Sequence, residues 1–272
     1  MTRRLKIFLS LLLIVCCWHF TSCVNKIENN EVKEITLPDL TGLSRKQISN
    51  ELDALKVTYE FKFAKIICND QNDYDKFVCY ENGLKAGSTI TSDKLIDIYT
   101  TPLHLNINNL DKVTLDTDYK GKSFVDDGIG EVKLARCVDG DTAHFYDPNS
   151  TTPNKLLKVR FLGIDTPEST IQNDPWGKAA SKFTANILNN ASTIVLEAEG
   201  ARTESYGRYL AWVWVDGKLL NLQLVQEAYT NSTTSSKSKY FKIMFETSIL
   251  AKKTGRRFYG EIDPNYNYKS KK

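Results

Sequence analysis

The sequence contains little histidine and little methionine, and its charges nearly cancel. Its 272 residues include three histidines, two methionines and six cysteines. No cluster of histidine and cysteine accompanies the acidic motifs of this chain, which disfavours a zinc site. The net charge of +3 is too small to indicate a partner by itself. The chain has no internal repeats, and its length together with 41% apolar residues predicts one or two globular domains.

The apolar run near the N-terminus is too short to span a membrane comfortably. Residues 7–15 are almost purely apolar and follow Arg3, Arg4 and Lys6. A positive start followed by a short apolar run is typical of an export signal. Residues 1–23 are therefore predicted to be a signal peptide.

The signal ends in Phe20-Thr21-Ser22-Cys23, which resembles the lipobox of bacterial lipoproteins. Phe20 departs from the leucine that usually stands three places before the cysteine. The resemblance implies that Cys23 is lipidated and becomes the new N-terminus. The protein would then be extracytoplasmic and held on the cell membrane by its lipid, or secreted if Cys23 is not modified.

The remaining cysteines predict at most one disulfide. Cys68 and Cys79 lie in one small region, and an exported protein meets oxidising conditions. A bond between them would contribute about 3 kcal/mol in the chain-entropy model. Two free thiols are the alternative. Cys137 has no partner left and is interpreted as a core residue.

Residues 25–34 read as a polar tether, and residues 35–102 as a small α+β domain. Ser44 and Gln47 form a capping-box pattern, followed by an apolar stripe of Ile48, Leu52 and Leu55. Strands are predicted at Tyr59–Ile67 and Leu95–Thr100.

This region resembles a PASTA domain, a module of bacterial proteins associated with the cell wall. The Pro-Asp-Leu-Thr-Gly start at residues 38–42 and the late Gly87 carry the likeness, whereas Lys85 stands where the family often has proline. The resemblance implies contact with peptidoglycan, and a simple spacer is an equal alternative. Residues 103–128 follow as a linker with room for one edge strand.

In residues 129–263, some segments alternate apolar and polar residues as strands do, and others have apolar residues at helical spacing. The predicted strands are Val132–Cys137, Thr142–Tyr146, Lys155–Gly163, Thr193–Glu199 and Tyr209–Val215, and the predicted helices are Pro175–Asn190, Asn221–Glu227 and Tyr240–Gly255. In the last helix the apolar stripe is predicted to include Phe241, Phe245 and Ile249. Residues 264–272 form a basic tail.

Three short segments of this region hold the residue types needed to hydrolyse a phosphodiester. They are Asp139-Gly140-Asp141-Thr142, Arg160 with Asp165-Thr166-Pro167-Glu168, and Tyr206-Gly207-Arg208. Arginines neutralise phosphate, aspartates hold a hard cation, and a glutamate can activate water. A structural ion pair is the alternative for Arg160, because an unpaired guanidinium is costly on an otherwise apolar strand.

The order and spacing of these segments resemble the staphylococcal nuclease (thermonuclease) family. Further matching pieces are Gly177-Lys178-Ala179-Ala180 and Asp216-Gly217-Lys218-Leu219-Leu220-Asn221. The resemblance implies a five-stranded OB-fold barrel with three helices, a fold of α+β, mainly β type. Glu227, where the family usually has glycine, and Phe258-Tyr259, in place of Leu-Trp, are departures.

The resemblance also implies roles for individual residues. Arg160 and Arg208 would bind the phosphate, and Glu168 would be the general base. Ca²⁺ would be held by Asp141, Asp165 and the carbonyl of Thr166, although the residue types alone also allow Mg²⁺. Asp139 would assist through water or serve only as a turn residue.

The implied substrates are DNA and RNA, cut to leave 3′-phosphate ends with little sequence preference. Tyr206 and Leu210 match family positions that line the base-binding pocket. Residues 129–272 carry 20 basic against 15 acidic side chains, which suits a polyanion. No protein partner is implied. The alternative is an inactive lipoprotein that binds nucleic acid or cell wall at the surface.

Overall fold

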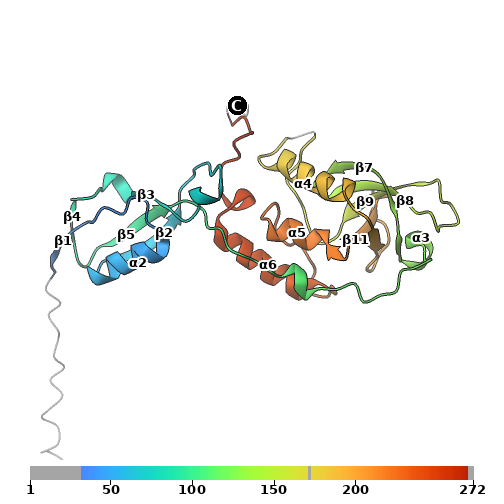
Figure 1. Ribbon diagram of the computed structural model, residues 1–272, viewed down its shortest axis with the longest axis horizontal. Helices are drawn as coiled ribbons and strands as arrows, with labels where there is room; N and C mark the ends of the chain where they lie inside the picture. The colour runs from blue at the N-terminus through green and yellow to red at the C-terminus, as the bar shows by residue number, and fades with distance from the viewer. Residues whose placement is uncertain (1–31, 171–172, 269–272) are drawn as a thin grey trace, which may run out of the picture.

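The computed structural model describes residues 32–170 and 173–268. Figure 1 shows an elongated molecule, with a small module of residues 34–100 at one end and a larger α+β domain at the other. The predicted signal peptide and Cys23 lie outside the described residues. Within the described part of the chain, no helix is long and apolar enough to cross a membrane.

The small module is a three-stranded sheet with one helix and a separate two-stranded ribbon. Its elements are β1 (Glu34–Thr36), α2 (Arg45–Ala54), β2 (Thr58–Phe63), β3 (Phe77–Tyr80), β4 (Thr89–Thr91) and β5 (Leu95–Thr100). In the sheet β5 is central, parallel to β2 and antiparallel to β3. The ribbon pairs β1 with β4. The predicted strand Leu95–Thr100 is confirmed, whereas β1, β3 and β4 were not predicted.

The predicted capping box starts α2. The Ser44 side chain accepts a hydrogen bond from the Gln47 N–H, and the Gln47 side chain accepts one from the Ser44 N–H. Ile48 and Leu52 are fully buried in the module's core. The prediction for Leu55 was wrong: it is 39% exposed, because the helix ends at Ala54 and the chain turns away.

The predicted disulfide is not formed, since Cys68 and Cys79 are both free thiols. Cys79 lies on β3 and is exposed, whereas Cys68 lies half-buried in the loop before the short 3-10 helix of residues 71–73. The Cys68 thiol donates to the Asp73 carbonyl at 4.0 Å. Burial, followed by the negative charges of Glu261 and Asp73, raises the pKa of Cys68 to about 12.

Residues 103–128 run along the larger domain without forming the edge strand that the sequence allowed. They contain a 3-10 turn at Leu110–Lys112 and the short helix α3 (Phe124–Asp127). Phe124 is fully buried in the core of the larger domain. Ile107 packs against Ala228 and Ala251. This stretch is therefore partly packed structure and not only a spacer.

The larger domain is built on one seven-stranded sheet. Its strands are β6 (Ile129–Glu131), β7 (Lys133–Asp139), β8 (Thr142–Tyr146), β9 (Leu156–Phe161), β10 (Ile194–Glu197), β11 (Tyr209–Val215) and β12 (Lys218–Leu219). The order is β6-β10-β11-β9-β8-β7, with β12 paired to β11. Strands β8 and β11 have the predicted bounds.

The predicted five-stranded OB-fold barrel is here a seven-stranded sheet that does not close. The sheet is open, because β6 and β7 do not pair with each other in the described part of the chain. The parallel pairing of β9 with β11 joins the meander β7-β8-β9 to the remaining strands. The OB-fold type of the domain stands, with the sheet left open at its two edges.

The three predicted helices are present; the first two pack on strands of this sheet, and the third packs on the second. They are α4 (Gly177–Asn189), α5 (Leu220–Gln226) and α6 (Phe241–Thr254). The predicted apolar stripe of α6 was wrong, because Phe245 is 50% exposed and Ile249 is 41% exposed. The buried side of α6 carries Met244, Thr247, Ala251 and Thr254 instead. Small and hydroxylated residues let this helix approach its neighbours closely, so its core face is poorly marked by hydropathy.

Asn221 joins the sheet to α5 through two buried hydrogen bonds. Its side-chain oxygen accepts the Val213 N–H at 2.9 Å, and its side-chain nitrogen donates to the Leu162 carbonyl at 2.8 Å. The residue is completely buried. It therefore satisfies the buried Val213 N–H and the partly buried Leu162 carbonyl.

Replacing Asn221 with leucine is expected to lower the free energy of unfolding by about 2–4 kcal/mol, because two buried backbone groups lose their partners. Urea unfolding followed by tryptophan fluorescence measures the change, since Trp176, Trp212 and Trp214 all lie in this domain. Gln223→Ala, on the same helix, is the control and should shift stability by less than about 0.5 kcal/mol. Equal stability of Asn221→Leu and wild type would contradict this role.

Candidate active site

The sheet brings the predicted site residues to one place. Arg160 on β9 is paired with Thr142 on β8 and, on its other side, with Leu210 on β11. Asp141 therefore lies next to Arg160, and the segment before β11 that carries Arg208 approaches from the opposite side. Residues far apart in the sequence meet here because β9 is central in this part of the sheet.

Arg160 is held between two aspartates. One guanidinium nitrogen donates to Asp141 Oδ1 and the other to Asp165 Oδ1. Asp141 is buried at 1% side-chain exposure, whereas Asp165 is 68% exposed. Asp141 Oδ2 also accepts the Thr166 N–H at 2.7 Å and the Thr166 hydroxyl at 3.0 Å. Burial raises the pKa of Asp141, against the opposing effects of Arg160 and Thr166.

Glu168 follows two residues after Thr166 on the same loop. Its backbone carbonyl accepts the Asp174 N–H at 2.7 Å, and its side chain is half-buried. The pKa of Glu168 is raised, first by burial and then by the neighbouring carboxyl of Asp139, while Arg160 lowers it. Glu168 therefore belongs to the same charged cluster as Arg160.

Arg208 faces this cluster from the other side. Its Nε donates to Glu204 Oε1, which is the largest cause of its raised pKa. The charges of Asp141 and Glu168 raise it further. Arg160 and Arg208 thus both interact electrostatically with Asp141 and Glu168.

Two residues of this cluster were missed as site residues from the sequence. Glu204 holds Arg208, and Thr230 accepts the Asp165 N–H at 3.2 Å while donating to the Asp165 carbonyl at 2.7 Å. The spacing of four residues between Glu204 and Arg208 was a usable signal. For Thr230 there was none, because it reaches Asp165 across 65 residues.

The two residues predicted to bind bases differ in their placement. Leu210 is half-buried on β11, next to Arg160 in register. Tyr206 lies in the preceding turn and is 84% exposed, so its ring is available to solvent. Trp212 and Trp214, interpreted from the sequence as packing residues, are buried and donate to Glu199 and Glu197.

The described residues contain no ready-made group of three or more His, Cys, Asp or Glu side chains for a metal ion. Asp141 and Asp165 nevertheless both hold the Arg160 guanidinium, so their carboxylates face a common cation. The donors here are all oxygens, the set that hard cations prefer. The residues fit a calcium ion in type, with Arg160 as the partner of both carboxylates in this structure.

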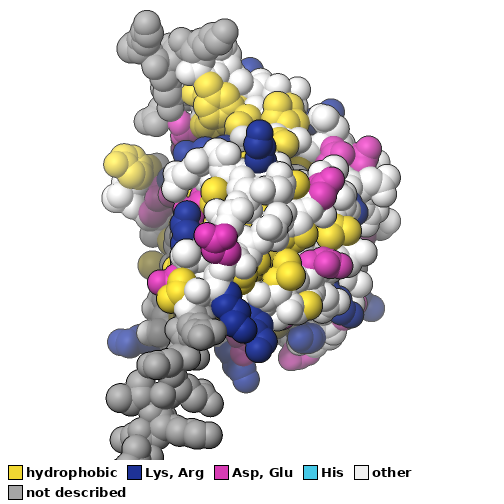
Figure 2. Space-filling view, turned by 90° about the vertical axis from the view of Figure 1, so that its left-hand side faces the viewer, with side chains coloured by type: hydrophobic (Ala, Val, Ile, Leu, Met, Phe, Trp, Pro, Cys, Tyr) yellow, Lys and Arg dark blue, Asp and Glu magenta, His cyan; other side chains and the backbone are white. Residues whose placement is uncertain are grey.

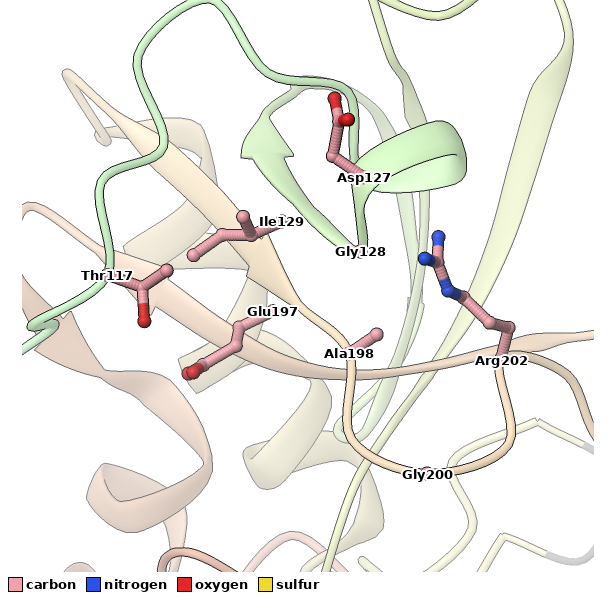
Figure 3. Close-up of a pocket in the computed structure, with 8 residues that line it drawn as sticks. All are labelled: Thr117, Asp127, Gly128, Ile129, Glu197, Ala198, Gly200 and Arg202. Atoms are coloured by element: carbon pink, nitrogen blue, oxygen red, sulfur yellow. The ribbon is translucent and has the colours of Figure 1, made fainter.

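A separate pocket of about 400 Å³ lies outside this cluster (Figure 3). In the close-up Arg202 points toward Gly128, whereas Glu197 turns away from it. Arg202 donates to the carbonyls of Phe124 and Val125 in α3, and Glu197 accepts from Trp214, Lys239 and Tyr240. These charged side chains are engaged in hydrogen bonds that stabilise the fold.

Comparisons with known proteins place the chain in a family. Residues 158–259 match the family described as staphylococcal nuclease homologue. The chain is 32% identical over 133 residues to a thermonuclease of Staphylococcus intermedius, covering 48% of this chain and 71% of that protein. It is 37% identical over 98 residues to a thermonuclease of Staphylococcus hyicus, covering 35% and 54%.

A third relative is the SPbeta prophage-derived endonuclease YokF of Bacillus subtilis, 40% identical over 101 residues, which cover 36% of this chain and 32% of that protein. The fold, the site and these relatives define a nuclease, a hydrolase of phosphodiester bonds. The chain belongs to the staphylococcal nuclease family. It spans less than two thirds of the S. hyicus and B. subtilis proteins.

Gly177→Ala is expected to lower the rate of nucleic-acid hydrolysis about 10²-fold. A Cβ at Gly177 would overlap the Glu168 carbonyl oxygen, so the Glu168 backbone must move, and small misplacements of a catalytic loop have effects of this size. Steady-state kinetics and a thermal melt check the change, with Ser181→Ala on the same helix as control. Full activity at unchanged stability would show that the position of this loop is unimportant.

Proposed function

We propose that this chain is an exported, calcium-dependent endonuclease that cuts DNA and RNA with little sequence preference and leaves 3′-phosphate ends. The observation that carries the proposal is the convergence of Arg160, Arg208 and Glu168 around the buried carboxylate of Asp141. An inactive binding protein would not need all three residues together.

Glu168 is the proposed general base. Its carboxylate takes a proton from a water molecule, and the water oxygen forms a bond to phosphorus as the bond to the 5′ oxygen breaks. The departing oxygen takes a proton from solvent. Glu168 suits the role because its loop is fixed by the Asp174 hydrogen bond and its side chain lies beside Arg160.

Arg160 and Arg208 bind the phosphate and stabilise the charge that develops on it. A guanidinium has five N–H donors, so Arg160 keeps some for substrate while it holds two aspartates. The planar fork donates two parallel bonds to phosphate, which a lysine cannot do. Glu204 accepts the Arg208 Nε–H and so restrains this guanidinium.

Ca²⁺ is the proposed cation, held by Asp141, Asp165 and the carbonyl of Thr166. When bound, it would polarise a phosphoryl oxygen and orient water. Tyr206 and Leu210 are the proposed base-contacting residues, and an exposed ring that can stack on any base supports weak sequence preference.

Glu168→Gln is expected to lower turnover by roughly 10²–10⁴, because general-base catalysis contributes about that much. Binding of a labelled oligonucleotide, measured by fluorescence anisotropy, should stay near the wild-type value. Glu246→Gln, at an exposed position on α6, is the matched control. Unchanged turnover in Glu168→Gln would remove this residue from the mechanism.

Ca²⁺ at about one hundred times its dissociation constant is expected to raise the free energy of unfolding by about 2.7 kcal/mol. Asp141→Asn should abolish this increase, because it removes the charge of the buried ligand, whereas Asp93→Asn in the small module should retain it. Urea unfolding with Ca²⁺ and with a chelator measures both. An equal response in all three proteins would contradict the assigned ligands.

We also propose that Cys23 anchors the protein to the outer face of the cell membrane through a lipid. The sequence alone supports this, since Cys23 lies outside the described residues. The small module is proposed as a PASTA-like unit that contacts peptidoglycan. Its compact core and separate sheet support an independent binding role.

Cys23→Ser is expected to move the protein from the membrane fraction to the soluble extracellular fraction, because the acyl chain would have no thiol to attach to. Immunoblots of fractionated cells measure the distribution. Cys137→Ser, in the nuclease domain, is the control and should stay with the membrane. A Cys23→Ser protein that still fractionates with membranes would show that the lipid is not the anchor.

A further inference from the structure

A second pocket, of about 460 Å³, opens where the small module, the active-site loop and the C-terminal segment meet. Its lining includes Lys65, Pro167, Trp176, Phe258 and Tyr268. In Figure 1 the C-terminal segment rises between the two parts of the molecule, at this junction. The pocket is distinct from the cluster around Arg160.

The pocket adjoins the catalytic loop directly. Pro167, one of its walls, immediately precedes Glu168. Asp174, another wall residue, donates its N–H to the Glu168 carbonyl at 2.7 Å. The start of α4 at Gly177 packs against the same carbonyl. The pocket therefore borders the loop that carries Glu168.

The small module is fixed beside the pocket by specific contacts. The Tyr74 hydroxyl donates to Glu261 at 3.2 Å, and just after the module the Leu103 N–H donates to the Thr254 carbonyl at 2.6 Å. The Phe63 ring lies so close to Gly255 that a Cβ there would overlap it. Since Lys65 follows Phe63 by two residues, this docking brings it to the pocket.

The chemistry of the lining fits a strand of nucleic acid. Phe258 is 43% exposed and Tyr268 49% exposed, which leaves two aromatic rings open at the pocket. Lys65 is exposed and has no ion pair among the described residues. By contrast, Arg257 is occupied by Glu227, and Glu261 accepts from Tyr74 and the Arg257 N–H.

Side chains of both charges cover the small-module end of the molecule. Figure 2, seen from the small-module end, shows basic and acidic side chains interspersed. Exposed aromatic rings beside one unpaired lysine are the combination found in grooves that hold single strands by stacking and backbone contact.

We propose that this pocket is an extended substrate subsite for single-stranded nucleic acid, in which Phe258 and Tyr268 stack on bases and Lys65 contacts a phosphate. The inference rests on the proposed nuclease function and extends it to a nucleotide several positions from the cleaved bond. The small module thereby contributes directly to substrate binding through Lys65.

The test compares the full-length double variant Lys65→Ala/Phe258→Ala with wild type on two substrates, a dinucleotide and a single-stranded oligonucleotide of about 20 nucleotides. For the long substrate, kcat/KM is expected to fall about 5- to 100-fold, the loss expected from removing one stacking ring. For the dinucleotide it should not change. The slope of log affinity against log salt should fall by about 0.7 for the lost phosphate contact.

The matched control is Lys46→Ala/Phe245→Ala, which removes the same residue types at exposed positions on α2 and α6. Its kinetics on both substrates should equal those of wild type. Tyr268→Ala is a second, independent variant and should affect only the long substrate.

The possible results test the subsite and the proposed nuclease function independently. Loss on the long substrate alone supports the subsite. Equal kinetics of variant and wild type on both substrates would overturn the subsite and leave the nuclease function intact. An equal loss on both substrates would also overturn it, because the effect would then lie at the catalytic cluster. A wild-type chain that cuts neither substrate would refute the proposed function itself.

Discussion

The buried carboxylate of Asp141 is the interaction on which the site depends. It comes from the turn between β7 and β8, yet it binds Arg160 on β9 and Thr166 on the following loop. A carboxylate with 1% exposure is stable only when its oxygens are fully engaged. Satisfying Asp141 therefore fixes the strand, the loop and the guanidinium relative to one another, and Glu168 takes its position from that loop.

Much of this arrangement could be predicted because local patterns and the final structure agree. The alternation in β8 and β11 and the capping box at Ser44 are local signals, and each element appears where expected. Which strands would pair was harder to predict. The open sheet depends on contacts at edges β6 and β7, which no short window of sequence encodes.

The predicted apolar stripe of α6 shows why the core face of a helix was harder to predict. Phe241, Phe245 and Ile249 have helical spacing, but Phe245 and Ile249 face solvent, and Thr247 and Ala251 face the core. Thr247 accepts a hydrogen bond from the Asn109 side chain at 2.8 Å, so a polar contact replaces apolar burial. The candidate site residues could be named from the sequence because phosphodiester chemistry requires particular residue types, whereas a core face tolerates many.

Glu227, which stands where the family usually has glycine, forms contacts at the junction with the small module. Glu227 pairs with Arg257 at 2.9 Å and Arg256 at 3.4 Å, and although burial would raise its pKa, these arginines keep the pKa lowered. Arg256 in turn lies over the Tyr74 ring of the small module, 5.6 Å from its centroid. Glu227 thus holds two arginines at the junction between the small module and the larger domain. Because Glu227 neutralises Arg257, Lys65 is the basic residue without an ion pair in the described lining of the pocket beside the active-site loop.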